Sequence, residues 1–365
     1  MATTTPFYLW SVPTSSDLVK NGATAIETLG DSVDASLWNS GYGQAGKNKI
    51  INSDFFVWQR GTTFTNPATS AYTADRWQVS HDGTAATRTV SQQTFTPGTA
   101  PVAGYEGQYF YRYAVSVAGT SNTFQDFRYN QEDVRTFAGQ TVTLSFWAKA
   151  DAARVVTLLY RTDYGSGGSS AAQASVGSVT LGTSWARYSV SYAVPSVSGL
   201  TLGTSSKGSW IFRPPAATVQ TIDIWGVQVE YGSYSTPFQT ASGGSQQSEL
   251  AMCQRYYQRQ YPNATTAGLG TGFADGTTVA LIKIPLKVTM RIAPTALEQS
   301  GTAADYGARI AGGTTVACNA VPTFFGATAD EAYASFPFAS GLTAGDGLFG
   351  RAAGTAAYLG WSAEL

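Results

Sequence analysis

The chain of 365 residues has few of the residues that cross-link small folds or hold metal ions. It contains two cysteines, Cys253 and Cys318, and one histidine, His81. Two cysteines in a chain of this length form no disulfide framework, and we expect two free, buried thiols. A single histidine argues against a histidine-rich zinc site, and a serine triad through His81 lacks a supporting G-x-S-x-G turn. We therefore expect neither a metal nor another cofactor.

Charged residues are also scarce. Asp, Glu, Lys and Arg make up 12% of the chain, about half the usual share, and the formal net charge is −1. Nucleic-acid binding needs a basic face, and no cluster of Lys and Arg is present, so no nucleic-acid partner is expected. Because no apolar run reaches spanning length and no basic segment precedes an apolar one at the N-terminus, we expect neither membrane insertion nor a secretory signal.

Residues 1–40 combine an aromatic arm with a predicted helix. The arm consists of Phe7, Tyr8 and Trp10. Thr14 is suited to cap the helix, with Asp17 three positions on as the carboxylate of a capping box. One face of the helix then carries the apolar residues Val19, Ile26, Leu29, Val33 and Leu37. A single helix cannot bury this stripe alone, so we expect residues 1–40 to attach the protein to a partner and to oligomerise it.

Residues 48–240 predict an antiparallel β-sandwich of jelly-roll type. Short runs that alternate with period two are separated by Gly, Pro, Ser and Asn turns. In TVTLSFWAKA, Val142, Leu144 and Phe146 share one face, and Trp147 and Lys149 share the other. The stretch from Asp163 to Ser175 is expected to be a flexible loop. The predicted strands are IINSDFFVW, DRWQVS, ATRTVSQQTF, GQYFYRYAVSV, FQDFRYN, QTVTLSFWAKA, RVVTLLYRT, SWARYSVSYAV and VQTIDIWGVQVE.

Residues 245–365 predict a smaller C-terminal β domain entered by a short helix. The helix, SELAMCQRYYQRQY, places Leu250, Cys253 and Tyr257 on one face and ends before Pro262. Strands rich in Ala, Gly and Thr are expected after it, in GTTVALIKIPL, KVTMRIAPT, GARIAGGTTVACN and AAYLGWSAEL.

A polysaccharide hydrolase would need two carboxylic acids on either side of the scissile bond. The candidates are Asp126, Glu132, Asp133 and Asp163. On a strand, Glu132 and Asp133 would point to opposite faces and could not flank one glycosidic bond. No catalytic residue is therefore assigned.

Aromatic residues are plentiful, with 9 Trp, 20 Tyr and 18 Phe. An exposed Trp or Tyr ring can stack on a sugar, whereas a sandwich with little charge needs most of its rings inside. For Trp147, Trp185, Trp210 and Trp225 packing within the fold is the first expectation. Trp147, Trp185 and Trp210 are also kept as candidate glycan contacts.

Four blocks that follow one another along the chain resemble a known family. They resemble tailed-bacteriophage tail-fibre or minor tail proteins that contain a carbohydrate-binding-module-like jelly roll. The resemblance implies a non-enzymatic virion component, often trimeric, that displays β domains to the host surface. The blocks are FYLWSVPTSSDLVKNGATAIETLGDSVDASL, KNKIINSDFFVWQRGTTFT with YTADRWQV, TLSFWAKA with IDIWGVQVEYGSYSTPFQ, and ELAMCQRYYQR with IPLKVTMRIAPT and SAEL.

The chain departs from this family where related modules often hold a structural Ca²⁺. Those modules use an acidic residue just after the first Asp-Phe and an Asp pair in the last strand, and here Phe56, Trp225 and Gly226 stand there. Other acids nearby do not rebuild a site of six or more oxygens, so no calcium is expected. These acids are Asp54, Asp223 and Glu230.

The sequence therefore predicts a tail fibre or minor tail protein located in the virion. Its expected partners are further copies of itself in a homotrimer, other virion proteins at the N-terminal arm, and a glycan or receptor on the host surface. Two alternatives stay open: a head fibre or decoration protein on the capsid, and a depolymerase that cleaves host polysaccharide.

Overall fold

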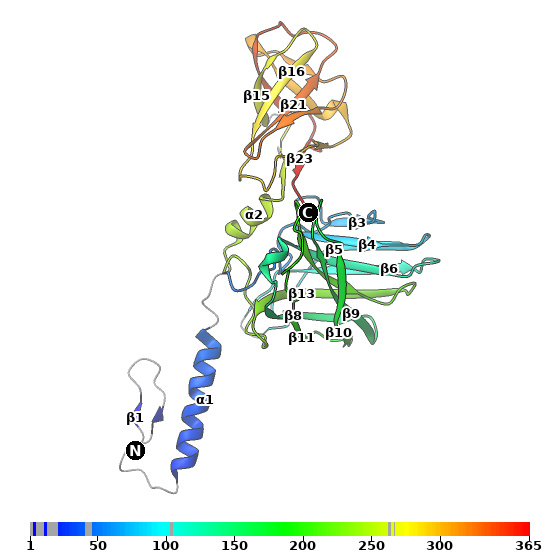
Figure 1. The fold of residues 1–365 in the computed structure, drawn as a ribbon. Helices are drawn as coiled ribbons and strands as arrows, with labels where there is room; N and C mark the ends of the chain where they lie inside the picture. Colours follow the sequence, from blue (N-terminus) through cyan, green and yellow to red (C-terminus); the bar gives the residue numbers. More distant parts are fainter. Residues whose placement is uncertain are drawn as a thin grey trace.

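The computed structural model describes residues 3–4, 11–12, 21–40, 46–102, 105–261, 264–265 and 267–365. The predicted fold class is confirmed. The protein is mostly β, with an N-terminal helix, an antiparallel two-sheet sandwich and a smaller C-terminal β domain entered through a short helix (Figure 1). The two cysteines are free and buried, as expected.

The N-terminal helix α1 spans Gly22–Ser40, and two short strands, β1 (Thr3–Thr4) and β2 (Ser11–Val12), pair before it. The side chain of Ile26 is 66% exposed, and Leu29 and Val33 are half-buried. Of the described part of the apolar stripe, Ile26 is thus left uncovered. The other residues expected to mediate attachment lie outside the residues whose side chains are described, as do the predicted capping residues: Phe7, Tyr8, Trp10, Thr14, Asp17, Val19 and Leu37.

Two antiparallel sheets form the sandwich. One has the strand order β10-β9-β12-β7-β4 and the other β11-β8-β13-β6-β5-β3, so most neighbours in space are distant in sequence. The strands are β3 (Thr63–Thr65), β4 (Trp77–His81), β5 (Thr87–Thr94), β6 (Tyr109–Val117), β7 (Gln125–Glu132), β8 (Thr141–Ala150), β9 (Arg154–Asp163), β10 (Ala172–Leu181), β11 (Ala186–Ala193), β12 (Lys207–Arg213) and β13 (Gln220–Tyr231).

The main core lies between these two sheets and is rich in aromatic rings. Val142, Leu144 and Phe146 of β8 point into it, as their alternation predicts. The fully buried rings of Trp77 and Phe212 lie with their centroids 6.1 Å apart. Aromatic pairs at this separation add to the free energy gained by burying their area.

The sandwich differs from the sequence prediction at three places. Residues 50–58 form turns instead of a strand, because the buried side chain of Asn52 takes over the backbone pairing: its Nδ2 donates to the carbonyl oxygens of Val57 and Asp75. The loop predicted at 163–175 is present but shorter, since β9 ends at Asp163 and β10 begins at Ala172. β12 was missed, since its residues are buried on both faces and show no apolar–polar alternation.

The short helix α2 spans Gln246–Gln254, and the chain then becomes β14 (Tyr257–Gln260). The predicted helix up to Tyr261 is therefore too long, because Tyr257–Gln260 pairs with the last strand, β23 (Leu359–Ser362). β17 (Glu298–Gln299) completes this three-stranded sheet.

A seven-stranded sheet makes up most of the C-terminal domain, with the order β19-β18-β22-β15-β16-β21-β20. The predicted strand KVTMRIAPT lies outside it and is not a strand. The sheet strands are β15 (Gly268–Ala274), β16 (Val279–Pro285), β18 (Tyr306–Arg309), β19 (Thr315–Ala317), β20 (Thr323–Ala327), β21 (Glu331–Pro337) and β22 (Gly347–Ala352).

The last residues of the chain contact the sandwich. The buried guanidinium of Arg76 forms an ion pair with Glu364, donates to the Asn130 carbonyl oxygen at 2.6 Å, and lies 3.5 Å from the centroid of the Tyr256 ring. The Tyr72 hydroxyl donates to the Leu365 carbonyl oxygen at 2.8 Å. A buried charge, a cation–π contact and hydrogen bonds thus join the two domains.

Candidate functional site

The two outer faces of the sandwich differ in the side chains they carry, and this difference shows which of the predicted glycan contacts are accessible. Trp210 is fully buried between the sheets, its ring 4.7 Å from that of Tyr160. Trp147 and Trp225 are buried on the outer face of the six-stranded sheet. Trp147 and Trp210 therefore have no ring face free for a ligand, and their assignment as glycan contacts was wrong.

An aromatic cover seals this part of the six-stranded sheet. We use the name for Phe95, Phe110, Trp147, Trp225 and Phe238, which form one buried cluster. Trp185 lies at the edge of the cover, 5.4 Å from Phe110, and is half-buried. Of the three candidate tryptophans, Trp185 alone keeps part of its surface open to solvent.

The outer face of the five-stranded sheet carries polar and aliphatic side chains instead. We call it the polar face and define it by the outward residues of its central strands: Asp126, Arg128, Asn130 and Glu132 of β7, Lys207, Ser209, Ile211 and Arg213 of β12, and Thr157, Leu159, Arg161 and Asp163 of β9. Strand pairing sets them in rows across the sheet, about 5 Å apart from one strand to the next. Among the described residues, no buried apolar cluster covers this face.

Hydrogen bonds fix much of the polar face before any ligand arrives. Arg213 donates two hydrogen bonds to Asp126, at 2.7 and 2.8 Å, in the bidentate geometry that arginine favours. The Ser209 hydroxyl donates to Asn130 Oδ1 at 2.7 Å, and Asn130 Nδ2 donates to the Tyr72 hydroxyl at 2.9 Å. Asp126, Asn130 and Ser209 are themselves buried, so this network fixes the sheet beneath the more exposed side chains of the face.

The carboxylates considered for hydrolysis do not form an open pair. Glu132 and Asp163 both lie opposite Lys207, one on each neighbouring strand, so the lysine stands between them. Arg255 and the hydroxyl of Tyr256 both donate to Glu132. Asp133 caps a short 3₁₀ turn after β7, and Asp126 is bound by Arg213. None of these acids faces a partner across a free gap.

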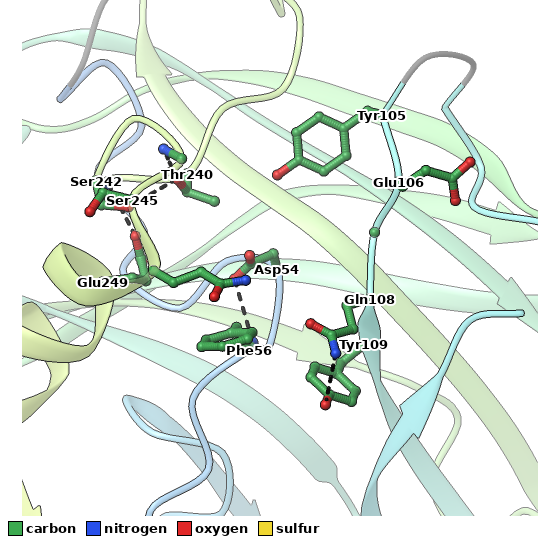
Figure 2. A pocket seen from close by; sticks show the side chains of 13 residues that line it. Asp54, Phe56, Tyr105, Glu106, Gln108, Tyr109, Thr240, Ser242, Ser245 and Glu249 are labelled. Carbon is green, nitrogen blue, oxygen red and sulfur yellow. Dashed lines mark hydrogen bonds between the residues drawn. The ribbon is translucent and has the colours of Figure 1, made fainter. Parts of the chain in front are cut away.

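A small acidic pocket lies where the start of α2 meets the sandwich (Figure 2). It encloses about 130 Å³, and Asp54 and Glu249 line it. Burial, followed by the negative charge of Glu249, raises the pKa of Asp54 to about 6. Figure 2 shows Tyr105 and Glu106 across the pocket from Glu249.

An acid with a raised pKa beside a second carboxylate is a pattern found in glycosidases. Here the second carboxylate is not available. Glu249 is buried, its Oε1 accepts from the backbone N–H of Asn52 at 2.6 Å, and its Oε2 accepts from the backbone N–H of Ser242 at 3.1 Å. Glu249 therefore ties the start of α2 to the sandwich, and the pocket is structural.

The acids near the expected calcium position are also taken up by protein groups. Asp223 accepts two hydrogen bonds from Arg112, at 2.7 and 2.9 Å, and Glu230 accepts from the backbone and hydroxyl of Thr236. In the part of the chain that is described, no three His, Cys, Asp or Glu residues gather as a metal site would need. The absence of calcium stays a prediction. No described helix has the length and apolar character of a membrane span.

A second exposed surface lies on the C-terminal sheet and was not predicted. Phe273 of β15 and Phe325 of β20 are 48% and 60% exposed. With Leu281 and Tyr333 they line an open groove of about 510 Å³, which we call the aromatic groove. Lys283 and Glu331 form an ion pair at its rim. In the sequence, the spacing of Thr271 and Phe273 indicates only that these two side chains share one face of a strand.

No protein-family model matches the chain, and no curated protein matches it. Three similar solved structures cover about half of it. The enzymatically active domain of bacteriophage CBA120 tailspike protein 4 is 17% identical over 51% of this chain and 22% of its own length, with a TM-score of 0.34. A CBM4 structure is 16% identical over 50% and 99%, with a TM-score of 0.32.

The CBM22-2 xylan-binding domain of Paenibacillus barcinonensis Xyn10C is 14% identical over 50% of this chain and 98% of its own, with a TM-score of 0.30. No conclusion about ligand or activity follows from matches at this level. The family that the sequence resembles stays a prediction.

Proposed function

We propose that this protein is a non-enzymatic attachment protein of a tailed-phage virion, a tail fibre or minor tail protein, that binds glycan on the host surface with the polar face of its sandwich. One observation carries the proposal. The aromatic cover seals the outer face of one sheet, whereas the other sheet presents rows of hydrogen-bonding side chains. Sugar hydroxyl groups both donate and accept hydrogen bonds, and the buried network around Asn130 and Ser209 holds this sheet in place.

Single contacts of this kind are weak, so adhesion would come from several copies acting together. Residues 1–40 would supply that multivalency by joining copies in a homotrimer and attaching them to other virion proteins. The exposed side chain of Ile26 supports this role, since an apolar residue on a helix gains free energy when a partner covers it. The absence of an open carboxylate pair favours binding over depolymerisation.

Blocking each exposed surface in turn tests the proposal. Burial raises the pKa of Cys318 to about 12 and that of Cys253 well above its usual range, so both native thiols are protected from alkylation. Thr157→Cys would place a reactive thiol on the polar face, and Thr271→Cys would place a matched one beside the aromatic groove. Each full-length variant is coupled to maleimide-polyethylene glycol.

We expect the coupled Thr157→Cys protein to lose binding to host cells and to a glycan array, and the coupled Thr271→Cys protein to keep it. Binding that survives the block at position 157 overturns the assignment of the polar face. Release of reducing ends from host polysaccharide by the unmodified protein would instead support the depolymerase. The position of its density in images of the virion distinguishes a tail protein from one on the capsid.

A further inference from the structure

Three cations on the polar face have no hydrogen-bond acceptor among the described residues. They are Arg128 of β7, Lys207 of β12 and Arg161 of β9, on three adjacent strands. Arg128 lies 3.7 Å from Asp126 and Arg161 lies 3.9 Å from Asp163, distances too long for hydrogen bonds. The Nε of Arg128 is buried without a partner.

Strand register places these three cations around one residue, Ser209. Arg161 lies directly opposite Ser209 on β9, and Lys207 is two residues before Ser209 on the same face of β12. Arg128 is two residues before Asn130, which pairs with Ser209 from the other side. With strands about 5 Å apart and about 7 Å between alternate residues, the three side chains can reach one bound group.

The acids on this face do not neutralise the cluster. Asp126 is occupied by Arg213, and Glu132 is held by Arg255 and Tyr256. Asp163 lies opposite Lys207 on the neighbouring strand and 3.9 Å from Arg161. Its Oδ1 also accepts a hydrogen bond from the backbone N–H of Gly165 at 3.1 Å. Lys207 and Arg161 thus share Asp163, while Arg128 shares Asp126 with Arg213 at the longer distance of 3.7 Å.

Repulsion between these cations adds to the effect of burial on the pKa of Lys207 and of Arg128. Burial lowers the pKa of Lys207, and Arg128, Arg161 and Arg291 lower it further against the opposing effect of Asp163. Burial likewise lowers the pKa of Arg128, Asp126 opposes this shift, and Arg161 and Arg213 add to it. A bound anion would relieve this repulsion.

We infer that Arg128, Arg161 and Lys207 form an anion subsite around Ser209, and that the glycan bound by the polar face carries carboxylate or phosphate groups. This inference rests on the proposed function. An oxyanion would accept charge-assisted hydrogen bonds from the two guanidinium groups and the ammonium group.

The test uses the full chain and three polymers: polygalacturonate for carboxylate, poly(glycerol phosphate) for phosphate, and dextran as the neutral control. We expect binding to one or both charged polymers and none to dextran, and weaker binding as NaCl rises from about 0.05 M to about 0.5 M. The charged polymer that binds more tightly identifies the anion.

Arg161→Gln and Lys207→Gln should each weaken binding about three- to tenfold, whereas Arg161→Lys should retain most of it. Asp163→Asn should tighten binding about two- to threefold, because it removes the competing carboxylate. Lys287→Gln on the C-terminal domain changes the net charge equally and is the matched control, expected to have no effect. Circular dichroism and thermal melting verify that each variant is folded.

If Lys287→Gln weakens binding as much as the other variants do, the attraction is nonspecific and the inference is overturned. The inference is also overturned if Asp163→Asn does not bind more tightly than the unmodified protein. A different outcome is that dextran or another neutral glycan binds at the polar face and that Arg161→Gln and Lys207→Gln do not change this binding. That outcome overturns the anion subsite and leaves the proposed function standing. If no glycan binds, charged or neutral, both fail.

Discussion

The two β domains differ in the residues that fill their cores and in where they leave phenylalanine rings exposed. In the sandwich, large rings such as Trp77, Trp210 and Phe212 fill the space between the sheets, and the outward residues of the five-stranded sheet are mostly polar. In the C-terminal domain alanine is the commonest core residue, while Phe273 and Phe325 face outward. A ring inside stabilises the fold, and a ring outside adds contact area for a partner. The C-terminal domain therefore uses rings in both ways: it buries Phe336 and Trp361 in its core and exposes Phe273 and Phe325 in the aromatic groove.

Removing a ring from each domain should give the largest difference. Trp210→Ala leaves a cavity between the sheets and is expected to lower the free energy of unfolding by about 3–5 kcal/mol. Phe325→Ala removes an exposed ring and should change it by less than about 0.5 kcal/mol. Denaturant unfolding followed by tryptophan fluorescence and circular dichroism measures both. Similar losses in the two variants would contradict the comparison.

The next prediction separates the domains. Glu364→Gln leaves the guanidinium of Arg76 buried without its counter-charge, although the Asn130 carbonyl and the Tyr256 ring still contact it. We expect a loss of about 3 kcal/mol and, since the junction weakens, two resolved unfolding transitions in calorimetry. Glu331→Gln removes an exposed ion pair with Lys283 and should leave the transition unchanged. A single unshifted transition in Glu364→Gln would show that this ion pair does not couple the domains.

The dependence of the free energy of unfolding on pH should then distinguish the sandwich from the C-terminal domain. The pKa of Asp54 is raised from its ordinary value of 3.8 to about 6, chiefly by burial, so the folded state holds a proton that the unfolded state has lost. The stability that this proton confers is complete below about pH 4 and is lost as pH rises through about 6. Asp54→Asn should therefore raise the free energy of unfolding at pH 7.5 by about 1–2 kcal/mol, a range reduced because the pocket is open to water.

The same substitution should flatten the stability profile between about pH 4 and pH 6. Asp275→Asn on the C-terminal domain is the matched control, since it is the same substitution at an exposed carboxylate. An Asp54→Asn profile parallel to that of the unmodified protein would show that Asp54 titrates at its ordinary pKa.

Sequence patterns predicted the parts of the fold in which one face is buried and the other is not. In β8 the alternation of Val142, Leu144 and Phe146 with Trp147 correctly assigned both faces. β12 could not be found in this way, because Ser209 and Ile211 on its outer face are as buried as Trp210 on its inner face.

The candidate surfaces were harder to predict because they depend on register between strands distant in sequence. The cations of the anion subsite come together only when β7, β12 and β9 pair, and β12 was the missing strand. On the C-terminal sheet, glycines hide which face is inward: a Cβ at Gly350 would lie 3.1 Å from Ile282, so the glycine makes room for this core side chain. A glycine in sequence does not reveal that a neighbour fills its place.

The smallest expected effect on stability belongs to the aromatic groove. Phe273→Ser combined with Phe325→Ser should leave the unfolding midpoint almost unchanged, because both rings already face water. Removing two exposed rings should nevertheless reduce self-association, since apolar patches of this kind drive contact between molecules. Sedimentation velocity across a concentration series measures this, with Thr157→Ser on the polar face as the control. A double variant that unfolds at much lower denaturant would mean that the two rings stabilise the domain, and that its aromatic side chains serve the same end as those of the sandwich.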